Sequence, residues 1–137
     1  MNFKALTIRQ PWAHAVIQGW KPIENRSWST KIRGTVAIHA AQRAEDKEFF
    51  DFIREKGLEA QVPLDMLTAR NLPHSAVIGL VDIIDCVTSS TSAWFEGPFA
   101  FVFANARPLR PISCRGALQI FDLNPAISQE IEHQLAE

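Results

Sequence analysis

Residues 4–40 read KALTIRQPWAHAVIQGWKPIENRSWSTKIRGTVAIHA, with charged, aromatic and glycine residues interleaved along them. A segment that only builds a hydrophobic core needs apolar residues at a regular period. Here a cation, a carboxylate and a guanidinium occur within six residues, at Lys21, Glu24 and Arg26. The stretch therefore predicts the first elements of the fold together with a functional site between them.

The same stretch predicts a strand, a helix and a second strand. Alternation over residues 3–8 favours a strand, while Pro11 in a first turn followed by Gly19 favours a short helix. Pro22 biases the residue before it towards extended backbone. The apolar run at 35–40, TVAIHA, predicts a buried strand. The charged residues are thus expected in an extended segment between helix and strand.

The rest of the chain completes an α+β pattern. Periodicity and turn signals predict helices at 45–56 and from Pro63 to about residue 70, strands at 76–87, 99–103 and 117–123, and a final helix capped by Asn124. Gly79 predicts a bulge or a close backbone approach. Ile127, Ile131 and Leu135 are expected to pack the final helix onto the sheet. We therefore expect one domain, residues 1–137, with a small mixed or antiparallel β-barrel and peripheral helices.

Composition excludes several classes of protein. A chain of 137 residues with 47% hydrophobic and 21% charged residues is large and apolar enough for one globular core. It contains no apolar run long enough to span a bilayer and no secretory signal, so we expect a cytoplasmic monomer without a membrane partner. Cys86 and Cys114 make a weak case for a disulfide, and the four histidines show no metal-ligand spacing. No metal and no cofactor are expected.

The net charge of −1 conceals an asymmetry along the chain. Residues 1–43 hold seven basic residues and one acid, and residues 105–120 add three arginines without an acid. Residues 44–104 hold ten acids and four basic residues. If the two basic segments meet in the fold, they form a positive face suited to an anionic partner. The alternative is that these charges are dispersed and solvated.

Six motifs occur in series and carry a family likeness. They are LTIRQPWA (6–13), GWKPIENR (19–26), SWSTKIRG (27–34), IGLVDIIDC (78–86), GPFAFVFANARPL (97–109) and PISCRG (111–116). With them the chain resembles the ASCH domain, a branch of the PUA-like fold. The resemblance implies a small pseudo-barrel whose cleft is lined by the first loop–helix junction, the segment 19–26 and the loop before the last strand.

The pattern is most similar to the ASCH domain of a eukaryotic transcription coactivator subunit, which implies binding of nucleic acid, RNA or DNA, or of a modified nucleotide through a basic cleft. A more distant branch contains amidohydrolases that deacylate N4-acetylcytidine-type nucleosides, and members with ribonuclease activity are reported. The amidohydrolase branch has a threonine where this chain has Glu24. The leading hypothesis is therefore a nucleic-acid-binding module, with a small hydrolase or a ribonuclease as alternatives.

Eight residues form the predicted ligand-binding set. They are Gln10, Trp12, Lys21, Glu24, Arg26, Trp28, Arg33 and Arg115. The cations among them are suited to phosphate, and Trp28 is suited to stack a base. Glu24 either holds Lys21 and Arg26 as a structural ion pair or accepts a proton. If the protein is an enzyme, Lys21 is the predicted general base, and Glu24 or a nearby hydroxyl group completes the proton transfer. His39 is the obvious imidazole for a ribonuclease, but a core histidine bonded to backbone is favoured.

Overall fold

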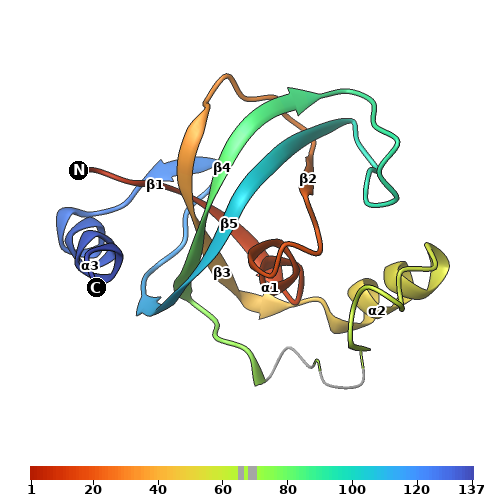
Figure 1. Ribbon diagram of the computed structural model, residues 1–137, viewed down its shortest axis with the longest axis horizontal. Coiled ribbons are helices and arrows are strands. Elements are labelled where there is room, and N and C mark those ends of the chain that lie inside the picture. The colour runs from red at the N-terminus through yellow and green to blue at the C-terminus, as the bar shows by residue number, and fades with distance from the viewer. Residues whose placement is uncertain (65–66, 68–70) are drawn as a thin grey trace.

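The structure is a computed structural model that describes residues 1–64, 67 and 71–137 (Figure 1). The elements follow in the order β1 (Lys4–Gln10), α1 (Trp12–Ile17), β2 (Ile23–Arg26), β3 (Gly34–Ala44), α2 (Asp46–Glu55), β4 (Ala76–Val87), β5 (Phe99–Ser113), β6 (Ile120–Asp122) and α3 (Pro125–Leu135). None of the helices described is long and apolar enough to cross a membrane. The second helix expected from Pro63 to about residue 70 falls largely outside the described residues.

One mixed sheet organises the molecule, with strand order β2-β5-β4-β3-β1-β6. The pair β1–β3 is parallel and the other four pairs are antiparallel. The prediction of an α+β fold with a mixed sheet is thus confirmed, but the prediction of a closed barrel is wrong. Closure requires the two outer strands to pair, and among the described residues β2 pairs only with β5 and β6 only with β1. The sheet is curved but remains open between β1 and β2 (Figure 1).

The core lies on both faces of this sheet. On one face, Leu6, Ile38 and Phe101 are fully buried in the cluster that α1 covers, and Trp12 joins it to a second cluster in which Phe49 and Ile53 of α2 are fully buried. The predicted period of the helix at 45–56 therefore matches its burial. On the other face, Ala5, Ala37 and Leu80 are fully buried together with Ile131 of α3. Burying each of the leucine, isoleucine and phenylalanine side chains contributes roughly 1.5–3 kcal/mol of transfer free energy.

Gly79 lies where α1 crosses β4. A Cβ at this position would lie 2.5 Å from Ile17 Cδ1 and 2.7 Å from the carbonyl oxygen of Arg107. The register of β4 on β5 also shifts between Val77 and Gly79. The expected close approach is therefore confirmed, and the absence of a side chain at Gly79 lets Ile17 of α1 pack against the backbone of β4.

The final helix, α3, packs on the far end of the sheet (Figure 1). Asn124 caps it, because its Oδ1 accepts a hydrogen bond of 2.9 Å from the backbone N–H of Ile127. Ile131 is fully buried, whereas Leu135 remains 51% exposed. The prediction that Leu135 packs against the sheet is wrong, because the end of α3 meets β5 through polar groups instead, namely the hydrogen bonds of Gln134 and Glu137 to Arg110.

Strand β5 is longer and β6 is shorter than the sequence predicts. β5 runs ten residues beyond Phe103 and includes Pro108 and Pro111, which lack an N–H for a ladder. Only the start of β5 lies between two strands, since β2 covers residues 99–102 alone. The two prolines thus lie in the part of β5 that pairs with β4 but not with β2, where a backbone N–H is not required for a second ladder.

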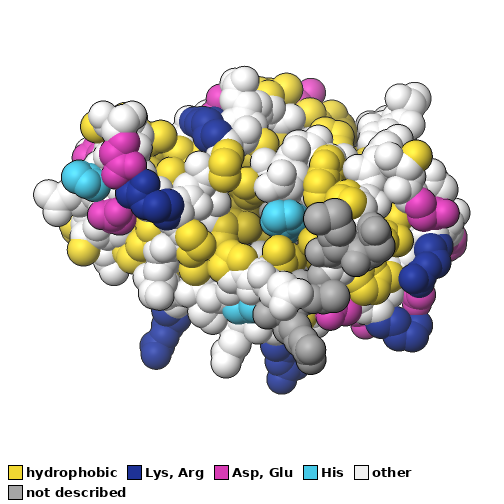
Figure 2. Space-filling view, turned by 60° about the horizontal axis from the view of Figure 1, so that its bottom comes forward, with side chains coloured by type: hydrophobic (Ala, Val, Ile, Leu, Met, Phe, Trp, Pro, Cys, Tyr) yellow, Lys and Arg dark blue, Asp and Glu magenta, His cyan; other side chains and the backbone are white. Residues whose placement is uncertain are grey.

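Apolar side chains gather across the middle of one face, as Figure 2 shows. Acidic and basic side chains lie together at both ends of this face, over α3 on the left and over α2 on the right, and further Lys or Arg side chains project from its lower edge. On the face drawn in Figure 2, the basic side chains do not gather into one positive surface. Four basic residues lie instead around the pocket at the opening of the sheet, and these are Arg9, Lys21, Arg26 and Arg43.

Candidate functional site

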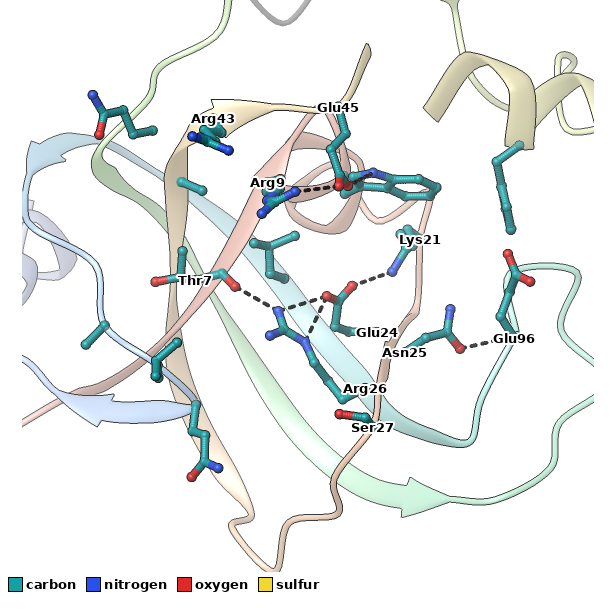
Figure 3. A pocket seen from close by; sticks show the side chains of 18 residues that line it. Thr7, Arg9, Lys21, Glu24, Asn25, Arg26, Ser27, Arg43, Glu45 and Glu96 are labelled. Atoms are coloured by element: carbon teal, nitrogen blue, oxygen red, sulfur yellow. Dashed lines mark hydrogen bonds and ion pairs between the residues drawn. The ribbon is translucent and has the colours of Figure 1, made fainter. Parts of the chain in front are cut away.

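A pocket of about 700 Å³ lies where the sheet stays open between β1 and β2 (Figure 3). Its walls come from β1, the start of α1, residues 21–27, the end of β3, and α2. Glu96 and residues 117–119 complete the rim. The same absence of a β1–β2 ladder that prevents barrel closure thus produces the concave site.

Lys21, Glu24 and Arg26 form one buried network in this pocket, which we call the inner cluster. Lys21 Nζ donates to Glu24 Oε1 at 2.6 Å and to the carbonyl oxygen of Ile23 at 2.6 Å. Arg26 donates to Glu24 Oε2 from Nη2 at 3.0 Å and from Nε at 3.2 Å. Of the two interpretations of Glu24, the structural ion pair with both cations describes this arrangement.

The inner cluster also ties β2 to β1. Arg26 Nη2 donates to the carbonyl oxygen of Thr7 at 2.7 Å, so a side chain spans the gap that no backbone ladder crosses (Figure 3). Lys21 lies 5.7 Å from the ring centre of Trp12 and is only 2% exposed. Its ammonium group therefore serves partners within the protein.

The charge of Glu24 is held in place by its neighbours. Burial by itself would raise the pKa of the carboxyl group, but the charges and hydrogen bonds of Lys21 and Arg26 outweigh it and lower the pKa below the ordinary value. Glu24 therefore stays ionised at neutral pH. A carboxylate with a lowered pKa is a weak proton acceptor, and both of its oxygens already accept hydrogen bonds from Lys21 and Arg26.

A second group of charges lies at the outer end of the pocket, and we call Arg9 and Arg43 the arginine pair. β1 and β3 run parallel, with Ile8 opposite Ala40 and Gln10 opposite Ala44, so Arg9 and Arg43 both lie in the stretch where the register shifts between these two pairs. Figure 3 shows both side chains at the same end of the pocket. The sheet register thus brings together two guanidinium groups that are far apart in sequence.

The two members of the arginine pair differ in their contacts. Arg9 Nη1 donates to Glu45 Oε2 at 2.7 Å, and Trp12 Nε1 donates to the other oxygen of Glu45 at 3.1 Å. Arg43 is exposed, and no hydrogen bond or ion pair joins it to any residue that the structure describes. One cation at the pocket mouth is therefore free to bind an external anion.

The opposite rim of the pocket is fixed by Asn25. Its Oδ1 accepts from the backbone N–H groups of Glu96 and Gly97, at 2.8 and 3.0 Å, and its Nδ2 donates to the carbonyl oxygen of Trp94 at 2.9 Å. The side chain of Glu96 is exposed towards the pocket, opposite the arginine pair in Figure 3. β2 therefore positions a carboxylate on this rim.

The structure brings only half of the predicted ligand-binding set to the pocket, namely Trp12, Lys21, Glu24 and Arg26. Gln10 is fully buried, where its Oε1 accepts from the N–H of His14 and its Nε2 donates to the carbonyl oxygen of Pro73. Trp28 packs edge-to-face on Phe101 at 5.0 Å. These two residues hold the fold around the pocket and do not line it.

Arg33 and Arg115 also lie away from the pocket. Arg33 Nη1 donates to two carbonyl oxygens of its own turn, those of Thr30 and Ile32. Arg115 lines a separate hollow of about 380 Å³ beside the start of α3. The two basic segments of the sequence therefore do not combine into one surface at this site.

Sequence reasoning missed five residues of the pocket as individual site residues, and these are Arg9, Asn25, Arg43, Glu45 and Glu96. Arg9 and Arg43 entered the sequence analysis only as part of the basic count. The alternation of side chains along β1 could have identified Arg9, because in a strand Thr7 and Arg9 point to the same face. Nothing in the local sequence places Glu45 or Glu96 beside them.

His39 is not free for acid–base chemistry. It is 2% exposed, its Nε2 lies 2.6 Å from the carbonyl oxygen of Cys114, and its Nδ1 lies 3.1 Å from Thr7 Oγ1. The backbone carbonyl requires Nε2 to be the donor, which leaves Nδ1 to accept from the hydroxyl. Burial lowers the pKa of His39, so the ring is neutral at pH 7. This is the core histidine favoured by the sequence.

No group of three or more His, Cys, Asp or Glu side chains lies together as a set of metal ligands within residues 1–64, 67 and 71–137. The two cysteines are free thiols. Burial raises the pKa of the Cys114 thiol, which lowers its thiolate fraction. The chemistry of the pocket is therefore that of guanidinium, carboxylate, amide and aromatic groups.

Comparison with known proteins gives a consistent result. The model of the ASCH domain family matches residues 6–113. Activating signal cointegrator 1 from Homo sapiens is 26% identical over 138 residues, covering 90% of this chain and 23% of the human protein. The Mus musculus protein of the same name is 30% identical over 88 residues, covering 61% of this chain and 14% of its own length. The chain thus spans less than a quarter of these relatives.

Solved structures show the same fold at low sequence identity. The crystal structure of ASCH from Zymomonas mobilis superposes with a TM-score of 0.55 and 15% identity, covering 95% of this chain and 93% of that chain. A variant of the same protein superposes with a TM-score of 0.57, also at 15% identity. At this identity the likeness concerns the path of the backbone alone.

Proposed function

Because this chain belongs to the ASCH domain family, we propose that it binds single-stranded nucleic acid in the pocket between β1 and β2. The observation that carries the proposal is the arginine pair, in which Arg43 has no partner among the described residues. A guanidinium group at the mouth of a concave site is well suited to a phosphate. Arg9 would join it by exchanging Glu45 for the ligand.

The dimensions of the pocket favour a single strand over a duplex. A volume of about 700 Å³ lies within the range of roughly 300 to 1,000 Å³ that is typical of ligand sites. Proteins that read a duplex insert a helix or a β-ribbon into a groove, whereas single strands are read base by base in concave sites. Trp12 and Phe52 supply aromatic surface for a base in this pocket.

The inner cluster has a supporting role in this proposal. Lys21 is held by two acceptors and is 2% exposed, so we assign the phosphate contacts to the arginine pair instead. Both of these contacts are made within the protein, and one of the two acceptors is the carboxylate of Glu24. No described contact therefore favours the hydrolase or ribonuclease alternatives over binding.

The test is the salt dependence of binding to labelled single-stranded oligonucleotides of about ten nucleotides, as RNA and as DNA. We expect affinity to fall with salt, because phosphate neutralisation releases counterions. Arg43→Gln should weaken binding to every sequence and reduce the slope of log affinity against log salt by about 0.7.

Arg54→Gln is the matched control, since Arg54 lies on α2 outside the pocket and the substitution removes the same charge. Its slope should remain equal to that of the wild type. Failure to bind any oligonucleotide at low salt would refute the proposal, and equal losses in the two variants would refute the assignment of the phosphate contact.

A further inference from the structure

Glu96 is an unexpected residue in a pocket proposed to bind a polyanion. Its carboxylate repels phosphate, so a site that only binds the backbone of a nucleic acid gains nothing from it. The side chain makes no hydrogen bond or ion pair with any residue in the described ranges. Figure 3 places it across the pocket from Arg43. The pocket thus has a free cation at one end and a free carboxylate at the other.

The backbone that carries Glu96 is held firmly. The side chain of Asn25 makes three hydrogen bonds to residues 94–97, at 2.8, 2.9 and 3.0 Å. Asn25 itself lies in β2, in register with Ala100 of β5. Trp94 at the start of the segment is 3% exposed. These hydrogen bonds fix the backbone of Glu96, and thus the point from which its side chain extends, relative to β2 at the pocket wall.

An ionised carboxylate is an acceptor only, with two oxygens side by side. Among the four standard bases, guanine alone presents two adjacent N–H donors, N1–H and N2–H, on its Watson–Crick edge. In a single strand this edge is free to be read. Trp12 and Phe52, in edge-to-face contact at 5.3 Å, add aromatic surface for the base in the same pocket.

We infer that Glu96 reads the Watson–Crick edge of an unpaired guanine whose phosphate is held by the arginine pair. This inference rests on the proposed function, and it names the nucleotide that the pocket prefers. Asn25 is a positioning residue in it, since it acts through the loop that carries Glu96. The site would then combine a sequence-independent contact at one end with a base-specific contact at the other.

The experiment uses RNA oligonucleotides of about ten uridines whose central residue is uridine, adenosine, guanosine or inosine. We expect the guanosine strand to bind about tenfold more tightly than the all-uridine strand, since a bidentate pair discriminates by this order. Inosine lacks the N2 amino group, so it should lose most of this gain. The strands differ in no phosphate, and salt effects are therefore matched.

Glu96→Gln gives the sharper result, because it should change two affinities in opposite directions. Binding of the guanosine strand should weaken, since an amide offers one acceptor in place of two. Binding of the all-uridine strand should strengthen slightly, since a charge that repels phosphate is gone. Glu59→Gln makes the same chemical change at an exposed residue outside the pocket and should change neither affinity.

Asn25→Ala tests the positioning role. It should reduce the affinity for the guanosine strand by a larger factor than the affinity for the all-uridine strand, so the ratio of the two affinities should fall towards one. Equal binding of guanosine and inosine strands, or a guanosine preference that survives in Glu96→Gln, would overturn the inference while leaving the proposed function intact. Failure to bind any of the strands would overturn both.

Discussion

The inner cluster and the arginine pair face the same pocket but differ in how far their charges are satisfied. Lys21, Glu24 and Arg26 bond one another at 2.6–3.2 Å and are largely buried. Arg9 is 51% exposed at its side chain, and Arg43 has no partner among the described residues. The charges that are clustered in the sequence, at residues 21–26, therefore hold the site together, whereas Arg43, which is isolated in the sequence, remains available to a ligand.

The largest effect is expected from breaking the inner cluster. Glu24→Gln should lower the free energy of unfolding by about 3 kcal/mol or more, because it leaves the buried Lys21 ammonium without its counter-ion. Urea denaturation followed by fluorescence or circular dichroism would measure this loss. Stability equal to that of the wild type would show that the cluster does not hold the fold.

The pH dependence of stability provides a second test of the inner cluster. The folded pKa of Glu24 lies below its ordinary value of 4.5, so its contribution is complete above that value and is lost as the pH falls through the folded pKa. The stability difference between wild type and Glu24→Gln should therefore be larger at pH 7 than at pH 3. A difference that grows on acidification would contradict the assigned charge state.

The N-cap of α3 provides a reference for these stability and affinity effects, because it belongs neither to the inner cluster nor to the arginine pair. Asn124→Ala should lower the free energy of unfolding by about 1 kcal/mol through loss of the hydrogen bond to the Ile127 N–H. Affinity for nucleic acid should not change, because α3 lies away from the pocket. A clear affinity loss in a folded Asn124→Ala protein would mean that α3 contributes to the binding surface.

The smallest effect is expected at the arginine pair itself. Glu45→Gln should increase affinity for single strands about two- to threefold, because it removes an exposed ion pair that competes with phosphate for Arg9, an interaction of about 0.5 kcal/mol. Fluorescence anisotropy at low salt would detect the change. A loss of affinity would indicate instead that Glu45 orients Arg9 for the ligand.

Much of the fold was predictable from local patterns. The strand at 76–87 and the helix at 125–135 follow from apolar runs and from the Asn-Pro start signal, and the structure has both. Barrel closure was not predictable in this way. It depends on whether two short outer strands meet, and that is decided by the curvature of the whole sheet.

The candidate site was only partly predictable, for a similar reason. The segment 21–26 is local in sequence, so its charged cluster was visible. The meeting of Arg9 and Arg43 depends on a parallel register between β1 and β3, and the position of Glu96 depends on a loop held by Asn25, 71 residues away. Trp28 was predicted to stack on a base but packs on Phe101. The sequence alone does not distinguish the two roles, because a tryptophan suits both.

The open seam between β1 and β2 has a consequence for association between molecules. Unpaired strand edges are templates on which other chains add, and proteins commonly cover them or place charges along them. Here the edge of β2 that does not pair with β5 and the part of β1 beyond Leu6, where its pairing with β6 ends, lie on two sides of a hollow. The Arg26 guanidinium group already occupies the Thr7 carbonyl oxygen. A strand from a neighbouring molecule would have to enter the hollow to pair. The protein can therefore keep an incomplete sheet at high concentration without growing into fibres through this edge.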